Sequence, residues 1–366
     1  MKLVISKQDL SQLIFKIQNI VPLKPTVPIL SHVLIESAND ELILTATDLV
    51  IGIRCFTEAK VLEEGSTTLP AKHFFQLIRE LSNVPIEITT TTSGSTEIVA
   101  GPSSFKLSGM RKEEFPELPD LKDATHIKID PKALKEALYR TSFATSKEDT
   151  RYALTGVYME IANKMITFVG TDGKRLAKAT APIVADESLQ RTLVLPFKLV
   201  EELQKIDDET EETTLFLMND KIAAETSKSI IVSKLLTGEY PDFQRVIPKK
   251  TDIQLSLHRE ELISLLRQVI LFTTETHCSA RFSFVEGELI MSANCVEVGE
   301  SKVSMPVNYN GQPLHIAFNP NFFLDILKHS RDETVNLGLI DSYNPGVITD
   351  SSNALFVIMP MRLQEV

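Results

Sequence analysis

Leu69-Pro70 is followed by the apolar helical run Phe74-Phe75-Gln76-Leu77-Ile78, and this stretch decides the fold because it occurs three times. A second copy opens at Leu195-Pro196 and a third at Asn319-Pro320, so the prolines are 126 and 124 residues apart. Self-similarity at a fixed period is the sequence mark of a repeated architecture. A chain of 366 residues therefore predicts three copies of one unit of about 122 residues.

Other landmarks keep the same period and the same order. They are Thr47-Asp48 with Thr171-Asp172, Phe115–Leu118 with Tyr240–Phe243, and Ser104–Ser108 with Ser229–Ser233 and Ala354–Ile358. The third copy is the most divergent, because Ala293-Asn294 stands where the others have Thr-Asp. Charged segments that contain Pro119 and Pro248 suit boundaries between units. We expect domains at residues 1–122, 123–247 and 248–366.

Each unit has the pattern of an α+β domain. Leu10, Leu13, Ile14 and Ile17 are spaced as one face of an amphipathic helix, and Ser6 is a suitable N-cap. Alternating strand-like runs follow, then the proline-started helix and further strands. Two helices and about eight strands per unit predict helices packed on antiparallel sheets.

Composition narrows the function. The net charge is −11 and the pI about 5.3, which excludes a protein that binds nucleic acid by being basic overall, although a local basic face remains possible. No apolar run approaches the ~18 residues that span a bilayer, and the N-terminus does not resemble a signal peptide. Three scattered cysteines suit a reducing compartment. We expect a cytoplasmic protein without a membrane partner.

Repetition is weak evidence for catalysis, since an active site needs one asymmetric group of residues. The common phosphate-loop, nucleophile-elbow and zinc-binding motifs are missing from the sequence, and we expect no catalytic residue, cofactor or metal. Two alternatives stay open. One is a repeat scaffold that binds peptides but no DNA. The other is a phosphate-handling enzyme that uses Asp172, Lys174 and Arg175, although copy one keeps Thr-Asp at this turn, which favours a structural role.

Five stretches carry a family resemblance: Pro25–Leu30, Thr45–Leu49, Val169–Leu176, Gly238–Val246 and Val357–Leu363. Through them the whole chain resembles the beta subunit of bacterial DNA polymerase III, the processivity sliding clamp. The resemblance implies three clamp domains per chain and a head-to-tail homodimeric ring, with helices lining the hole and sheets forming the outer wall. It also implies a non-catalytic DNA sliding clamp that encircles duplex DNA without reading its sequence, and tethers the replicative polymerase.

The resemblance also assigns roles to residues. The DNA-side candidates are Lys24, Lys147, Tyr152 and Lys198. The dimer contact is assigned to Phe105 and Leu107 in copy one and to Ile270 and Leu271 in copy three, with fewer charges than the family often has there. A pocket for short partner peptides is assigned to Leu154, Thr171, Gly173, Lys174, Arg175, Leu176, Pro241, Arg245, Val246, Val357, Met359, Pro360, Met361 and Arg362.

The partners implied in this way are the catalytic subunit of DNA polymerase III, the clamp loader and other proteins with a clamp-binding motif. The chain also departs from the family pattern at its end. It runs past Leu363 with Gln364-Glu365-Val366, which moves the terminal carboxylate relative to the pocket.

Overall fold

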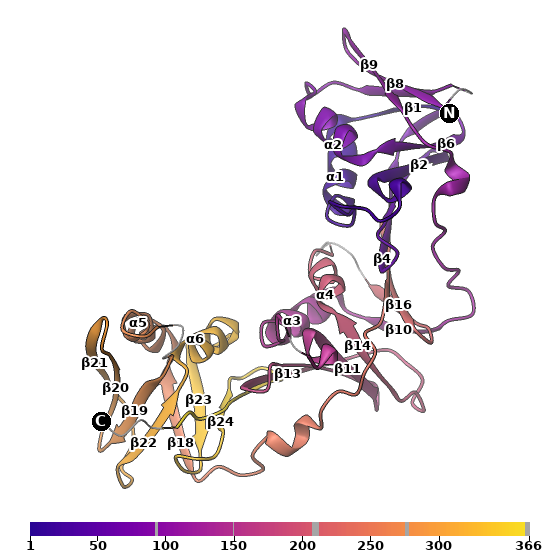
Figure 1. The fold of residues 1–366 in the computed structure, drawn as a ribbon. Coiled ribbons are helices and arrows are strands. Elements are labelled where there is room, and N and C mark those ends of the chain that lie inside the picture. Colours follow the sequence, from indigo (N-terminus) through magenta and orange to yellow (C-terminus); the bar gives the residue numbers. More distant parts are fainter. Residues whose placement is uncertain (92–93, 149, 207–211, 275–277, 363–366) are drawn as a thin grey trace. The chain divides into compact units, whose positions relative to one another are not determined.

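The computed structural model describes residues 1–91, 94–148, 150–206, 212–274 and 278–362 (Figure 1). The chain divides into two compact units. The first contains residues 1–131 and 201–235, and the second contains residues 132–200 and 236–366. Each unit includes four strands of the second repeat, so the boundaries expected near residues 122 and 247 stay a prediction. The Gln364–Val366 extension lies outside the described residues.

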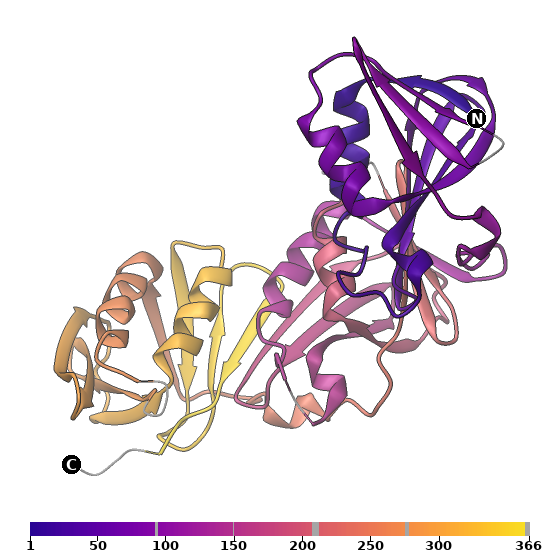
Figure 2. The same ribbon diagram turned by 45° about the horizontal axis from the view of Figure 1, so that its top comes forward.

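The first unit contains two antiparallel sheets. The five-stranded sheet has the order β5 (Lys60–Glu63), β1 (Lys2–Ile5), β7 (Ile86–Thr90), β8 (Ser95–Ala100), β9 (Ser103–Ser108). The eight-stranded sheet has the order β10 (Thr125–Ile129), β15 (Thr213–Leu217), β16 (Lys221–Thr226), β17 (Ser229–Lys234), β4 (Ile51–Glu58), β3 (Glu41–Thr47), β2 (His32–Ala38), β6 (Gly65–Pro70). Helices α1 (Lys7–Ile17) and α2 (Ala71–Glu80) pack side by side (Figure 2).

The second unit repeats this plan. Its eight-stranded sheet has the order β14 (Arg191–Pro196), β11 (Gly156–Ala162), β12 (Met165–Thr171), β13 (Arg175–Pro182), β25 (Ala354–Ile358), β24 (Gly346–Thr349), β23 (Thr334–Leu339), β18 (Ile253–His258). Its four-stranded sheet has the order β21 (Gly299–Pro306), β20 (Glu288–Cys295), β19 (Ala280–Val285), β22 (Leu314–Phe318). Helices α5 (Arg259–Ile270) and α6 (Pro320–His329) pack side by side. The helix α3 (Pro131–Ser142) belongs here except for its first residue, and α4 (Phe197–Leu203) spans the division between the units.

The helix predictions are confirmed. Leu10, Leu13, Ile14 and Ile17 are the buried residues of α1, and the Ser6 hydroxyl accepts a hydrogen bond from the Asp9 N–H at 3.1 Å. Such a cap satisfies an N–H group that the first helical turn leaves without a partner. The described residues contain six α-helices, two for each predicted repeat, on antiparallel sheets. The α+β class is therefore confirmed.

The repeats are joined through their sheets. Strand β17 of the second repeat pairs with β4 of the first, and β25 of the third repeat pairs with β13 of the second. In both joints a backbone hydrogen bond also ties the end of the strand to the neighbouring turn. At the end of β17 the Lys234 N–H donates to the Val50 carbonyl at 2.8 Å, and just after β25 the Met359 N–H donates to the Lys174 carbonyl at 2.9 Å. Each eight-stranded sheet therefore continues from one repeat into the next, and the pairing of β17 with β4 and of β25 with β13 sets how the two repeats are aligned.

Candidate peptide pocket, strand edges and helix charges

A cavity of about 200 Å³ lies in the second unit at the joint between β13 and β25. The 3₁₀ turns Tyr152–Thr155 and Phe243–Val246 border it, together with the β12–β13 turn. The residues lining it are Arg151, Leu154, Thr171, Gly173, Arg175, Leu176, Pro241, Asp242, Phe243, Val246, Val357 and Met359. A concave, mainly apolar site with a few polar groups is the usual form of a ligand pocket.

The β12–β13 turn gives the cavity a rigid rim. The Thr171 hydroxyl donates to the Arg175 carbonyl at 2.6 Å, and Asp172 Oδ1 accepts from the N–H groups of Lys174 and Arg175 at 2.9 and 3.0 Å. Gly173 has φ +82°, in the left-handed region that glycine adopts without steric cost.

The same turn occurs in copy one. The Thr47 hydroxyl donates to the Ile51 carbonyl at 2.9 Å, and Asp48 Oδ1 accepts from Val50 and Ile51 at 2.9 and 2.8 Å. There Leu49 takes the glycine's place at φ +73°. The Thr-Asp pair therefore builds a turn in both repeats, which supports the structural interpretation of this motif.

The floor of the cavity is an apolar cluster. Val169, Leu176, Phe243 and Val357 are buried together, and Tyr240 packs against them. The Tyr240 hydroxyl donates to the Val169 carbonyl at 3.2 Å, and burial raises the pKa of this hydroxyl well above its usual value. The floor is therefore uncharged, so an apolar side chain can be buried on it without leaving a charge unpaired.

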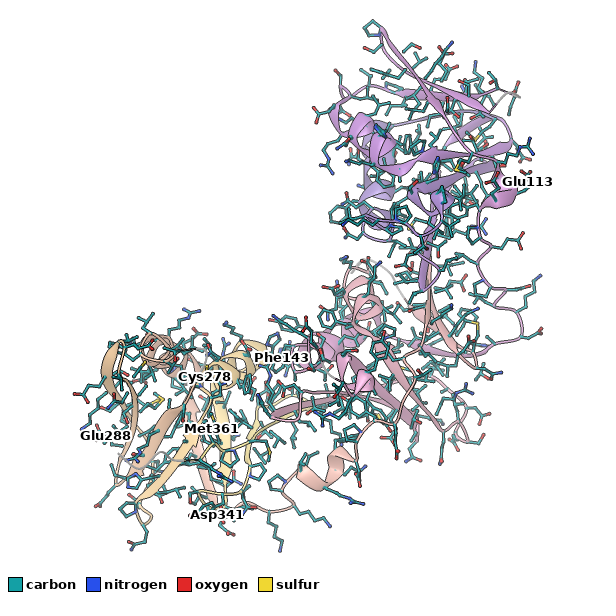
Figure 3. All side chains as sticks on the ribbon, in the orientation of Figure 1. Glu113, Phe143, Cys278, Glu288, Asp341 and Met361 are labelled. Atoms are coloured by element: carbon teal, nitrogen blue, oxygen red, sulfur yellow. The ribbon has the colours of Figure 1, made fainter. Side chains whose placement is uncertain are left out.

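Arg175 forms one wall and is itself held by the protein. Its Nε lies 3.2 Å from Asp172 Oδ2, and its Nη1 lies 2.7 Å from Asp325 Oδ2 on α6. Its Nη2 donates to the Phe143 carbonyl at 3.0 Å. Phe143, labelled in Figure 3, lies where α3 approaches α6. The side chain of Arg175 is only 11% exposed.

The structure brings nine of the fourteen predicted pocket residues to the cavity wall. The other five are not among its lining residues: Lys174, Arg245, Pro360, Met361 and Arg362. The segment that follows β25 is pinned at both ends, by the Met359 bond to Lys174 and by the Met361 N–H, which donates to the Ala317 carbonyl at 2.8 Å. This pairing places the Met361 backbone beside β22, and Met361 is not among the residues that line the cavity.

Three lining residues were missed by the sequence analysis: Arg151, Asp242 and Phe243. A Cβ built on Gly173 would lie 3.4 Å from Arg151 Nη2, so Arg151 reaches over the turn. Asp242 and Phe243 belong to the repeated Tyr240–Phe243 landmark. The signal that could have pointed to them is the repeat itself, because the Tyr240–Phe243 landmark recurs with the same period as the Thr-Asp turn that borders the cavity.

Two of the predicted dimer residues lie on the edge strand β9, and the other two lie at the end of α5, which packs on the edge strand β21. Within the described residues, β9 and β21 each pair with one strand only. Phe105 on β9 is 36% exposed and Leu107 is partly exposed, while Leu271 at the end of α5 is 70% exposed. Ile270, its neighbour in α5, is half-buried. An open edge with apolar side chains is a template for pairing with another chain.

The repeat explains why these two strands are open. Strand β9 is the counterpart of β17 and β25, and β21 is the counterpart of β4 and β13, by the period of the sequence. Counterparts of these two kinds join each other twice inside the chain. One strand of each kind is left over.

The predicted DNA residues are all at the surface to different extents. Lys24 and Lys147 are exposed, Tyr152 is 61% exposed, and Lys198 is half-buried. Lys24 belongs to the first unit and the other three to the second. Their contact with DNA stays a prediction.

The helices show a charge pattern that the sequence analysis did not use. The six helices of the described residues carry eleven Lys or Arg and eight Asp or Glu, a net charge of +3. The chain as a whole carries −11, so everything outside these helices carries −14. Positive charge is therefore concentrated on one kind of element in an acidic protein.

Two kinds of site are absent from the described part of the chain. None of its helices is long and apolar enough to cross a membrane. The same residues contain no group of three His, Cys, Asp or Glu side chains that could hold a metal ion.

Comparison with known proteins covers nearly the whole chain. The N-terminal, central and C-terminal domains of the DNA polymerase III beta subunit match residues 1–119, 128–242 and 244–362. The beta sliding clamp of Chlamydia trachomatis is 55% identical over 365 residues, which are 100% of this chain and 88% of that protein. The beta sliding clamp of Escherichia coli K12 is 31% identical over 369 residues, covering 99% of this chain and 100% of that protein.

Solved structures of sliding clamps have the same fold as this chain. The DNA polymerase sliding clamp of Bacillus subtilis superposes with a TM-score of 0.94 at 26% identity, covering 100% of both chains. A DNA polymerase III beta subunit from Pseudomonas aeruginosa has a TM-score of 0.94 at 28% identity, covering 99% of this chain and 100% of that one. The chain therefore belongs to the DNA polymerase III beta subunit family, the DNA sliding clamps.

Proposed function

We propose that two copies of the chain close into a ring by pairing β9 of each with β21 of the other. The observation that carries this proposal is the leftover pair of strands, since their counterparts already join the repeats within one chain. A head-to-tail contact that is made twice closes, whereas one that does not return forms a filament. The domain limits at residues 1–122, 123–247 and 248–366 belong to this proposal.

We propose that duplex DNA passes through the ring and faces the helices. A net charge of +3 on the helices in a chain of −11 supports this orientation. Phosphate contacts from Lys and Arg carry no sequence information and weaken with salt, which suits a protein that must slide. Lys24, Lys147, Tyr152 and Lys198 are the proposed contacts.

The cavity in the second unit is proposed to bind extended partner peptides through its apolar floor. The proposed donors of such peptides are the catalytic subunit of DNA polymerase III, the clamp loader and other proteins with a clamp-binding motif. The clamp would thereby hold the polymerase at the primer end. The family is non-catalytic, so Asp172, Lys174 and Arg175 are not assigned a phosphate-handling reaction. Among the described residues none of the three cysteines forms a disulfide, and two of them are buried, which supports a cytoplasmic location.

Ring closure is tested by mass in solution. Sedimentation should give twice the chain mass of 40.9 kDa over a wide dilution range. A single-chain mass throughout, or masses that keep growing with concentration, would refute closure.

The DNA-facing role of the helices is tested by charge reversal. Lys132→Glu with Lys135→Glu on α3 should weaken retention on DNA at moderate salt. The control is Lys221→Glu with Lys228→Glu, on β16 and the turn after it, and should leave retention unchanged. Equal loss of retention in the two double variants would mean that net charge alone explains the effect, and would contradict the DNA-facing role of the helices.

A further inference from the structure

Arg175 is a wall of the partner pocket, but the contacts that orient it come partly from the third repeat. Its guanidinium pairs with Asp325 Oδ2 at 2.7 Å and lies 4.5 Å from the ring centroid of Phe322. Both residues are on α6, far from Arg175 in sequence and on the other side of the β13–β25 joint. The pocket wall is therefore assembled from two repeats.

The guanidinium has little capacity left for a ligand. Three donors are committed, to Asp172, Asp325 and the Phe143 carbonyl. The rings of Phe143 and Phe322 lie within 5.3 and 4.5 Å of its central carbon. Arginine has five N–H donors in a rigid planar fork, and here two carboxylates offset its charge. Arg175 thus lines the cavity as a fixed side chain whose charge is already offset by two carboxylates, rather than as a free positive charge.

We propose that Asp325 and Phe322 are positioning residues for the partner pocket, acting only through Arg175. This inference rests on the proposed peptide-binding function. Without Asp325 the guanidinium loses its charged partner on α6 and turns toward the cavity, where it narrows the space above the apolar floor and brings in a charge with fewer partners. Peptide affinity then depends on how α6 packs against the second repeat, although α6 supplies no residue to the cavity lining described above.

The test is the equilibrium binding of a labelled short peptide with apolar anchor residues, which suit the apolar floor. Asp325→Asn should weaken binding about tenfold, the effect of about 1.4 kcal/mol. Phe322→Leu keeps an apolar side chain and removes the ring face, and should weaken binding about threefold. The matched control is Asp341→Asn, which keeps the capping geometry of its own loop and should leave affinity unchanged.

A double-mutant cycle separates positioning from general damage. In an Arg175→Ala background, Asp325→Asn should have no further effect on affinity, and the dimer mass and melting temperature should stay close to those of Arg175→Ala. Full additivity in the cycle would overturn the inference, as would unchanged affinity in both Asp325→Asn and Phe322→Leu. If the unaltered protein fails to bind the peptide, the proposed peptide-binding function fails first, which is a different result.

Discussion

Replacing Leu107 with alanine tests the proposed pairing of β9 with β21 of a second copy. The counterparts of Leu107 in the two joints within the chain are Val232 and Val357, which are 4% and 1% exposed. Leu107 itself is partly exposed in the single chain. If β9 forms the same kind of joint, Leu107 becomes buried as its counterparts are.

The size of the effect follows from that burial. Truncating a buried leucine to alanine costs about 2–5 kcal/mol, and we take about 2 kcal/mol because the strand lies at an edge. The ring contains two such contacts, so the dimer should lose about 4 kcal/mol, which corresponds to roughly a thousandfold weaker association. Salt should change this value little, because the contact is apolar.

The assay is the dimer dissociation constant from sedimentation equilibrium on serial dilutions. The matched control is Leu62→Ala on β5, the opposite edge strand of the same sheet, where the leucine is 50% exposed. It should leave the constant unchanged. A Leu107→Ala constant within about threefold of the unaltered protein, well under 1 kcal/mol, would refute the pairing, and equal weakening by both variants would show that the effect is not specific to β9.

Three further predictions address the second unit. Arg140→Met leaves Asp350, whose side chain is fully buried, without its counter-charge. It should lower the free energy of unfolding by about 3 kcal/mol, measured as faster amide hydrogen exchange in α3 and β25. The control Arg331→Met, at an exposed ion pair, should cost under about 1 kcal/mol, and equal effects of the two variants would contradict the argument. Gly173→Ala should lower the melting temperature through a strain of about 1 kcal/mol, and an unchanged value would show that the turn relaxes. Burial lowers the pKa of His329, although its hydrogen bond to Asp325 opposes the shift. The contribution of His329 to stability is therefore present above about pH 6.5 and is lost as the pH falls through the lowered pKa. Between about pH 7.5 and 5.5 His329→Phe should lose less stability than the unaltered protein, and parallel curves of stability against pH for the two proteins would count against this linkage.

Much of the fold could be predicted because the information is local and repeated. The spacing of Leu10, Leu13, Ile14 and Ile17 fixes the buried face of α1, since side chains three and four residues apart share one face of a helix. The Thr-Asp pairs lie in identical turns of two repeats because their hydrogen bonds close within five residues. Such features need no knowledge of distant contacts.

The site was harder to predict because it depends on pairing between repeats. The sequence shows Met361 in an apolar run but not its strand bridge to Ala317, and Met361 is not among the residues that line the cavity. Arg175 was recognised as a pocket residue, yet its contact with Asp325 joins positions 150 residues apart. Periodicity cannot reveal contacts of that kind, since they follow from the β13–β25 register.

The most direct test of the clamp account is retention on circular DNA. The protein would be loaded on a nicked plasmid with a clamp loader from a relative, and co-elution would be measured at high salt before and after the plasmid is linearised. A topological link predicts co-elution with the circle and loss on linearisation, since phosphate contacts are weak at high salt. Retention on the linear DNA at high salt would mean tight direct binding and would contradict the ring mechanism.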